Sequence, residues 1–271
     1  MSNVPEIRFK GFTAAWTQRK LEEVADIFDG THQTPNYTNI GVKFVSVENI
    51  SNLSGTKKFI SIEDYNSQFK NKATVGDIFM TRITAGIIGE TAIVESSEDF
   101  AYYVSLALIK PRSDMSSKFV NYSIHADLFK NELNKRIIHT AFPKKINLNE
   151  IGKCEIACTN PDEQEKIGTF FRNLDKLIAA TQRKVEKLKQ LKAAYLQQMF
   201  PQTGECMPRV RFAGFTGDWS IKKFSEIVER VSKSSEAKGL PRVEFEDIIS
   251  GDGRLNKDIY AEVSVLAWQA R

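Results

Sequence analysis

Residues 160–201 read NPDEQEKIGTFFRNLDKLIAATQRKVEKLKQLKAAYLQQMFP, and this stretch decides the fold. Apolar residues recur in it at alternating intervals of four and three, which is the pattern of a helix with one continuous apolar stripe. The stripe comprises Ile167, Phe171, Leu174, Ile178, Val185, Leu188, Tyr195 and Met199, and the two remaining positions of the pattern are polar, Thr181 and Lys192. Roughly 37 residues at about 1.5 Å each predict a helix about 55 Å long. A helix of that length needs a partner helix, so we expect the stripe to mediate helix pairing.

The first residues of this stretch suit a helix N-terminus. Asn160 is a favourable N-cap, Pro161 fits the first helical position, and Glu163 can supply the second half of a capping box. Helices inside single globular domains are usually far shorter, so a core helix is the weaker interpretation.

A repeat flanks this helix. Residues 5–28 read PEIRFKGFTAAWTQRKLEEVADIF and residues 208–231 read PRVRFAGFTGDWSIKKFSEIVERV, with nine identities in 24 positions at an offset of 203. An interval near 200 residues indicates duplicated domains and not the short repeats of a solenoid. Phe9, Phe12 and Trp16 carry too much aromatic surface for a free loop, so we expect them to anchor it on a core.

The chain between the first repeat and the helix has the pattern of a mixed α/β domain. Apolar runs bounded by turn residues predict strands at Val42–Val47, Val75–Thr81, Thr91–Val94 and Tyr102–Lys110. An apolar stripe with helical spacing predicts a single helix over residues 117–133.

We therefore predict an α/β (α+β) fold in three parts. A first domain spans residues 1–158, the long coiled-coil-type helix spans 159–201, and an incomplete second domain spans 202–271. Within the last part we expect a polar loop at residues 232–239.

Composition leaves the function open. A net charge of +4 and 41% apolar residues are ordinary for a globular protein and tolerate a polyanionic partner without requiring one. No signal peptide or membrane span is evident, so we expect a cytoplasmic protein without membrane contact. Cys154 and Cys158 are expected to be buried thiols and not half of a zinc site.

Motifs for bond-breaking chemistry are absent from the sequence. It contains no Asn/Asp-Pro-Pro-aromatic tetrapeptide of adenine methyltransferases, no P-loop and no glycine-rich cofactor loop. The Gly86–Gly89 cluster is better read as a turn between strands. We therefore predict no catalytic residue, no cofactor-binding site and no metal site in this chain.

Three segments combine cations with neutral hydrogen-bonding groups, the mixture that suits phosphates and base edges of DNA. The candidate DNA-binding residues are Thr31, His32, Arg82, Thr84, Lys135, Arg136, His139, Thr140, Lys144 and Lys145. A solvated loop explains residues 130–145 equally well. Arg82 has two readings as well, because it could reach a guanine edge or pair with Glu90 or Asp77.

The whole pattern resembles the specificity subunits of type I restriction-modification enzymes. The resemblance rests on the duplicated P-x-[IV]-R-F-x-G-F-T-x-x-W opening and on four further features. These are the Gly30–Pro35 turn, the Gly76–Phe79 element, the Gly86-x-x-Gly89 turn and the long helix that begins at Asn160. It covers residues 5 to about 245.

This resemblance implies a subunit without an active site, in which each α/β target-recognition domain reads one half of a bipartite DNA target. Long helices separate the two domains and dock methyltransferase subunits, through which the restriction subunits join. S-adenosylmethionine, ATP and Mg²⁺ are expected in those partners and not in this chain.

The sequence departs from the family pattern because it ends at Arg271, before a second complete domain and a second long helix. A natural half-subunit, a frameshifted product and a trimmed fragment all fit this departure. We expect two copies to pair through residues 162–199 and so restore the symmetry. The alternative is a scaffold or anti-restriction decoy that binds methyltransferase subunits but no DNA.

Overall fold

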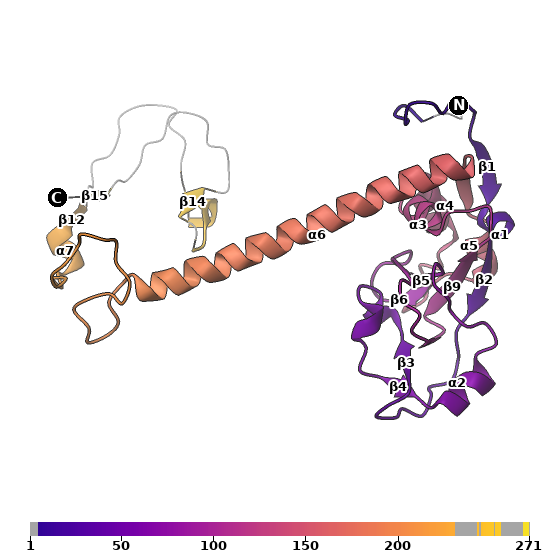
Figure 1. The fold of residues 1–271 in the computed structure, drawn as a ribbon, viewed down its shortest axis with the longest axis horizontal. Coiled ribbons are helices and arrows are strands. Elements are labelled where there is room, and N and C mark those ends of the chain that lie inside the picture. Colours follow the sequence, from indigo (N-terminus) through magenta and orange to yellow (C-terminus); the bar gives the residue numbers. More distant parts are fainter. Residues whose placement is uncertain (1–4, 231–242, 244, 252, 256–267, 271) are drawn as a thin grey trace. The chain divides into compact units, whose positions relative to one another are not determined.

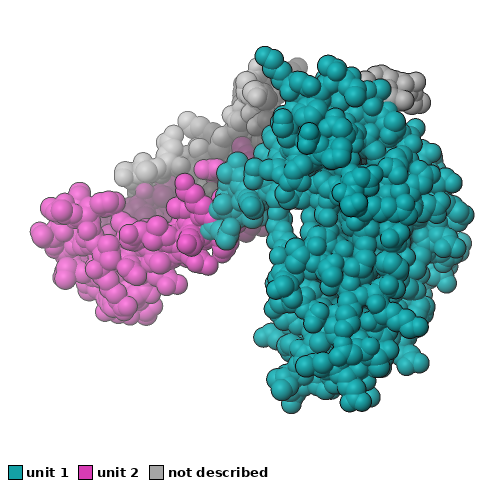
Figure 2. Space-filling view, turned by 45° about the vertical axis from the view of Figure 1, so that its right-hand side comes forward, with its two compact units in different colours: residues 1–183 teal, residues 184–271 magenta. Residues whose placement is uncertain are grey.

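The computed structural model describes residues 5–230, 243, 245–251, 253–255 and 268–270. Its contacts divide the chain into two compact units, residues 1–183 and 184–271 (Figure 2). The predicted mixed α/β class and the long helix are both confirmed (Figure 1). The loop expected at residues 232–239 lies outside the described residues. No helix within the described ranges is long and apolar enough to cross a lipid bilayer.

Two sheets form the centre of the first unit. Four strands, β2 (Ala25–Asp29), β5 (Ile78–Thr81), β7 (Thr91–Ile93) and β9 (Leu106–Pro111), make an antiparallel sheet in the order β2-β9-β5-β7. In the second sheet, β3 (Val42–Val45) lies between β4 (Phe59–Ile60) and β8 (Phe100–Tyr102), antiparallel to the former and parallel to the latter.

Shorter elements complete this unit. Two antiparallel pairs join β1 (Thr17–Lys20) to β11 (Glu155–Cys158) and β6 (Ile83–Thr84) to β10 (Lys144–Lys145). The short helices are α1 (Leu21–Val24), α2 (Ile62–Gln68), α3 (Ser117–Ile124), α4 (Asp127–Arg136) and α5 (Leu148–Gly152).

The four-stranded sheet separates two hydrophobic cores, because successive side chains of a strand point to opposite faces. On β5, Ile78 and Met80 pack with α3, α4 and α5, whereas Phe79 packs with the three-stranded sheet and α2. Figure 1 shows these two groups of elements at opposite ends of the unit. Burial on both faces explains why the strand reads as a continuous apolar run.

Two predicted elements are each divided in the structure. The run predicted as one strand at Tyr102–Lys110 turns at residues 103–105 and supplies β8 and β9 to different sheets. The helix predicted over residues 117–133 is interrupted at Ala126, whose extended backbone (φ −76°, ψ 153°) separates α3 from α4. Both breaks lie in segments without proline or glycine, so the sequence pattern gave no stop signal.

The long helix is α6 (Pro161–Gln198), 38 residues long. The side chain of Asn160 caps it by accepting a hydrogen bond from the Glu163 backbone N–H at 2.9 Å. The expected second half of the capping box is wrong, because the Glu163 carboxylate instead accepts hydrogen bonds from Arg8 and Thr159. That carboxylate therefore joins the first repeat to the helix.

The second unit repeats the beginning of the first. Its α7 (Phe224–Ile227) and β12 (Val228–Arg230) lie 203 residues after the corresponding positions of α1 and β2. Two antiparallel pairs follow, β12 with β15 (Trp268–Ala270) and β13 (Ile248–Ile249) with β14 (Arg254–Leu255). The sequence repeat is thus also a repeat of secondary structure.

Candidate nucleic-acid interface

Three loop segments of the first unit, residues 30–34, 82–87 and 138–146, meet beside the end of β2. The pairing of β6 with β10 places Thr84 opposite Lys144. We call the surface of these three segments the loop face. It brings together candidate residues from parts of the chain that lie more than one hundred positions apart.

Arg82 supports the loop face from beneath. Its side chain is only 9% exposed. The guanidinium donates to the carboxylate of Asp29 and the carbonyl of Val104 at 2.8 Å each, and to the carbonyl of Ile146 at 3.3 Å. Bonds to three chain segments make Arg82 a positioning residue, and they leave little of its guanidinium for a base edge.

Asp29 serves two of the candidate residues at once. Besides Arg82, its carboxylate contacts His32 Nε2 at 2.8 Å. The expected pairing of Arg82 with Glu90 or Asp77 is wrong, because the last residue of β2 takes that place. His32 keeps 71% of its side chain exposed, so one ring edge stays accessible.

Gly30 allows the first segment to lie against the sheet. A Cβ at this position would approach the carbonyl oxygen of Tyr102 to 2.5 Å, closer than any real side chain permits. The neighbouring Thr31 donates its backbone N–H to the same carbonyl at 3.0 Å. The turn is therefore fixed by backbone contact, and Thr31 sits at a defined position.

The cations of the loop face differ from those of α4. Lys144 and Lys145 are exposed on β10, and neither forms an ion pair among the described residues. Lys135 and Arg136 both bind Glu132, at 2.8 and 3.0 Å. The hydrogen bond from Lys135 holds the pKa of Glu132 below its usual value. Two cations are thus available for phosphates, and two are already engaged.

The tip of the third segment contains a residue that sequence reasoning missed. Phe142 is 90% exposed, close in sequence to the candidates His139 and Thr140, which are exposed as well. His139 Nε2 lies 3.1 Å from the carbonyl oxygen of Asn134. The signal in the sequence was a single aromatic residue in front of Pro-Lys-Lys.

The start of α6 is bound tightly to the rest of the first unit. Gln164, 2% exposed, accepts from the backbone N–H of Ser116 at 3.0 Å and donates to the carbonyl of Thr159 at 2.7 Å. The buried carboxylate of Glu163 pairs with Arg8, whose hydrogen bond lowers the pKa of that carboxyl. A buried polar side chain must be satisfied in this way.

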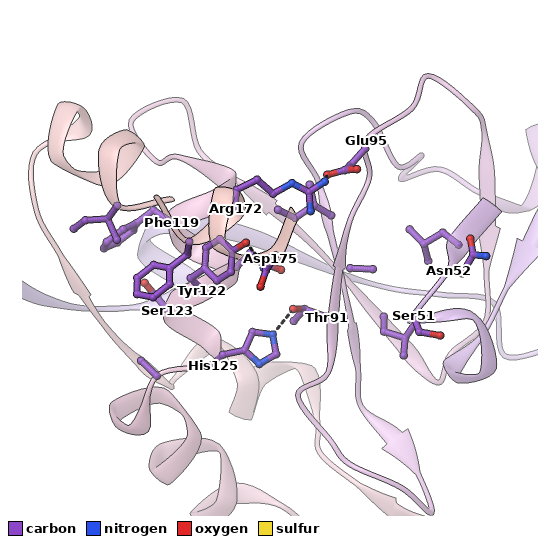
Figure 3. Close-up of a pocket in the computed structure, with 18 of the residues that line it drawn as sticks. Ser51, Asn52, Thr91, Glu95, Phe119, Tyr122, Ser123, His125, Arg172 and Asp175 are labelled. Atoms are coloured by element: carbon purple, nitrogen blue, oxygen red, sulfur yellow. Dashed lines mark hydrogen bonds and ion pairs between the residues drawn. The ribbon is translucent and has the colours of Figure 1, made fainter. Parts of the chain in front are cut away.

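A groove of about 1110 Å³ lies between α3, α6, β7 and residues 50–54 (Figure 3). Polar contacts cross its walls: Tyr122 donates to Asp175, Arg172 pairs with Glu95, and His125 contacts Thr91 at 2.7 Å. Each contact joins segments that are distant in the sequence. The first four turns of α6 are consequently fixed in direction relative to the domain.

The apolar stripe of α6 divides into two parts. Ile167 packs against the core of the first unit, and Phe171 stacks on Tyr122 with ring centroids 5.3 Å apart. The members from Leu174 to Tyr195 remain 39–55% exposed. Met199 lies just beyond the last helical residue. Ile167 therefore anchors the helix in its own domain, whereas Phe171, although it contacts Tyr122, is 43% exposed like the later members.

The cysteines and histidines do not form a metal site within the described ranges. Cys154 and Cys158 are buried free thiols, as predicted. Burial raises the pKa of the Cys154 thiol to about 12 and that of Cys158 to about 11. Both thiols remain protonated at neutral pH and act as small apolar side chains.

A mixed α/β domain fastened to the start of a long helix is also the fold of known restriction-modification subunits. A solved HsdS subunit from Thermoanaerobacter tengcongensis matches with a TM-score of 0.50 and 20% identity, over 73% of this chain and 47% of its own. A structure described as the "structural basis underlying complex assembly and conformational transition of the type I R-M system" matches with a TM-score of 0.53 and 20% identity, over 68% and 45%.

Residues 14–190 match the family model of the type I restriction modification DNA specificity domain. The chain belongs to this family. A putative type I restriction enzyme MjaX specificity subunit from Methanocaldococcus jannaschii is 22% identical over 192 residues, which are 68% of this chain and 45% of that protein. The chain thus spans somewhat less than half the length of this curated relative.

Proposed function

We propose that this chain binds double-stranded DNA through the loop face and reads one half of a bipartite target. The observation that carries the proposal is the pair of unengaged cations, Lys144 and Lys145, beside neutral groups on fixed backbone. Lysines bind phosphates, whereas Thr31, His32 and Thr84 offer the hydrogen-bonding groups that distinguish base edges. Arg82 holds these segments in register.

The test is DNA binding by the chain together with its methyltransferase subunit, measured over a range of salt concentrations. Changing Lys144 and Lys145 to alanine should lower the affinity about tenfold and reduce the slope of log K against log salt by about 2. Lys70→Ala removes an exposed lysine outside the loop face and should leave both quantities unchanged.

A scaffold or decoy that binds methyltransferase subunits gives a different result. Such a protein would join the complex normally but would retain no DNA in any sequence or salt condition. Binding of the complex that ignores the two lysines would also contradict the proposed loop face.

We further propose that α6 docks the methyltransferase subunits, and through them the restriction subunits. Beyond the anchored turns the helix surface is exposed on all sides, with five basic residues between positions 183 and 192. S-adenosylmethionine, ATP and Mg²⁺ would then bind in those partners, which carry out the chemistry. Methylation by the isolated chain should be undetectable, and co-purification with a methyltransferase subunit should be stoichiometric.

Pairing of two copies through α6 completes the proposal. The exposed stripe from Leu174 to Tyr195 needs an apolar partner, and a second copy offers the same stripe. Two copies related by a two-fold axis would present two identical loop faces and read an interrupted palindrome. Sedimentation equilibrium at micromolar concentration tests the pairing, and a strict monomer, with or without methyltransferase subunits, refutes it.

A further inference from the structure

The two copies of the repeated motif bury different faces. In the first motif, residues 5–16, Arg8 binds the buried Glu163 and Phe9 packs edge-on against Phe170, with ring centroids 5.9 Å apart. These contacts attach the first motif to the start of α6. Ile7, on the same motif, is left 92% exposed.

The second motif, residues 208–219, contacts the other end of the helix. Val210, the counterpart of Ile7, donates its backbone N–H to the carbonyl of Gln198 at 3.0 Å. Trp219 packs edge-on against Phe200, with ring centroids 5.9 Å apart. In the first motif the counterpart Trp16 instead packs edge-on against Phe119 of α3, with ring centroids 5.8 Å apart, so the two motifs use the same position for different partners.

In the second motif, the counterparts of Arg8 and Phe9 make other contacts. Phe212 is 72% exposed, compared with 38% for its counterpart Phe9. The guanidinium of Arg211, the counterpart of Arg8, donates to the carbonyl of Gly217. Both residues line an apolar groove of about 470 Å³ together with Phe215 and Tyr195.

We propose that the second motif docks onto the start of α6 in a second copy of this chain, in place of that copy's own first motif. The repeat identifies the segment that docks there. Arg211 and Phe212 of the second motif match Arg8 and Phe9 of the first motif, which contact Glu163 and Phe170 of α6. The inference rests on the proposed pairing through α6.

The exchange also fixes the direction of pairing. The second motif is attached at the end of α6, so contact with the start of the partner's α6 requires the two helices to run antiparallel. The same contact then forms at both ends of the pair, as two-fold symmetry demands. Arg8 and Arg211 then compete for the carboxylate of Glu163, because the second motif of one copy replaces the first motif of the other. We call the contact of Arg211 and Phe212 with Glu163 and Phe170 of the second copy the clasp.

The dissociation constant of the pair tests the clasp in the full-length chain. Arg211→Ala should weaken pairing by about tenfold, because it removes a charge-assisted hydrogen bond to Glu163 of the second copy. Arg209→Ala is the matched control, since Arg209 binds Glu205 within its own motif at 3.1 Å. In a Glu163→Gln background the effect of Arg211→Ala should largely disappear.

Disulfide trapping identifies the contact directly. Two differently tagged chains, one with Phe170→Cys and the other with Phe212→Cys, both with the exposed Cys206 changed to serine, are mixed and oxidised. A disulfide between the two tags supports the clasp. Stable pairs that give no such disulfide and tolerate Arg211→Ala overturn the clasp but leave the pairing intact, whereas monomers alone overturn the pairing itself.

Discussion

Asp29 shows how single residues shape the loop face. Its carboxylate meets a buried arginine on one side and an exposed histidine on the other, each at 2.8 Å. The two partners have different roles because their exposure differs: Arg82 joins segments, and His32 is accessible to a ligand. Arg82→Ala should therefore lower the stability of the fold, whereas His32→Ala should weaken DNA binding without affecting stability.

Arg82→Ala should lower the free energy of unfolding by about 2–3 kcal/mol, because it removes the guanidinium that donates to Asp29 and to two backbone carbonyls. His32→Ala should change it by less than about 0.5 kcal/mol, as expected for an exposed position. Urea denaturation measures both. Equal losses for the two variants would contradict the supporting role of Arg82.

His125 gives the recognition domain a dependence on pH. Burial lowers the pKa of its imidazole, and among the smaller effects Glu90 and Asp175 raise this pKa whereas Lys130 lowers it further. Below about pH 6.5, the usual histidine pKa, the unfolded chain takes up a proton that the folded chain resists. Stability should thus fall as the pH drops from about 6.5 towards 5. His125→Gln should flatten this part of the profile, and an unchanged profile would show that the imidazole does not contribute.

The candidate residues were identified in the sequence by their types alone, and their contacts become visible only in the fold. The cations and neutral polar groups were recognisable from their mixture in short segments. Whether a given arginine faces solvent or three carbonyls depends on segments that meet only in the fold, as with Arg82 and Ile146. Phe142 was missed because one aromatic residue in a loop has no periodicity to mark it.

At the scale of elements, the contact between α6 and α3 sets the direction of the long helix. Gly168 lies where the two helices approach, and a Cβ there would come within 2.6 Å of Lys118 Cβ and 2.9 Å of the Phe119 backbone nitrogen. The approach would be impossible for any larger residue without displacement of α3.

Gly168→Ala should therefore destabilise the protein by about 1–3 kcal/mol, although alanine is the better helix former by about 1 kcal/mol. The matched control is Gln182→Ala, at an exposed position of the same helix, which should be neutral or slightly stabilising. Thermal unfolding of the two variants checks this. A stabilised Gly168→Ala protein would mean that the close contact between the helices does not exist.

The long helix and the strands β3, β5 and β7 were predictable from the sequence, whereas the breaks between β8 and β9 and between α3 and α4 were not. The apolar stripe of α6 persists over many turns, and a periodicity of that length distinguishes a helix from a strand or a loop. The strands β8 and β9 form one apolar run, and only the two sheets to which they belong separate them. The break between α3 and α4 likewise depends on the packing of Ile124 and Phe129 into one core.

At the scale of the whole molecule, we propose that the open stripe of α6 mediates the pairing of two copies. Ile178→Glu with Leu188→Glu places two charges on side chains that are now 54% and 55% exposed and would be buried in a pair. The dissociation constant of the pair should rise by at least a hundredfold in sedimentation equilibrium. Gln190→Glu adds a charge on another face of the helix and should change it little. Equal effects would exclude the stripe as the pairing surface.

We propose above all that a long helix holds a DNA-reading face at a fixed distance from its twin. Mapping of methylated adenines in a host that expresses this chain with its methyltransferase subunit tests it most directly. We predict methylation at an inverted pair of short sequences separated by a gap of constant length, and a marked reduction of this methylation when Lys144 and Lys145 are alanine. Methylation without a constant gap, or with full activity in the lysine variant, would contradict the claim.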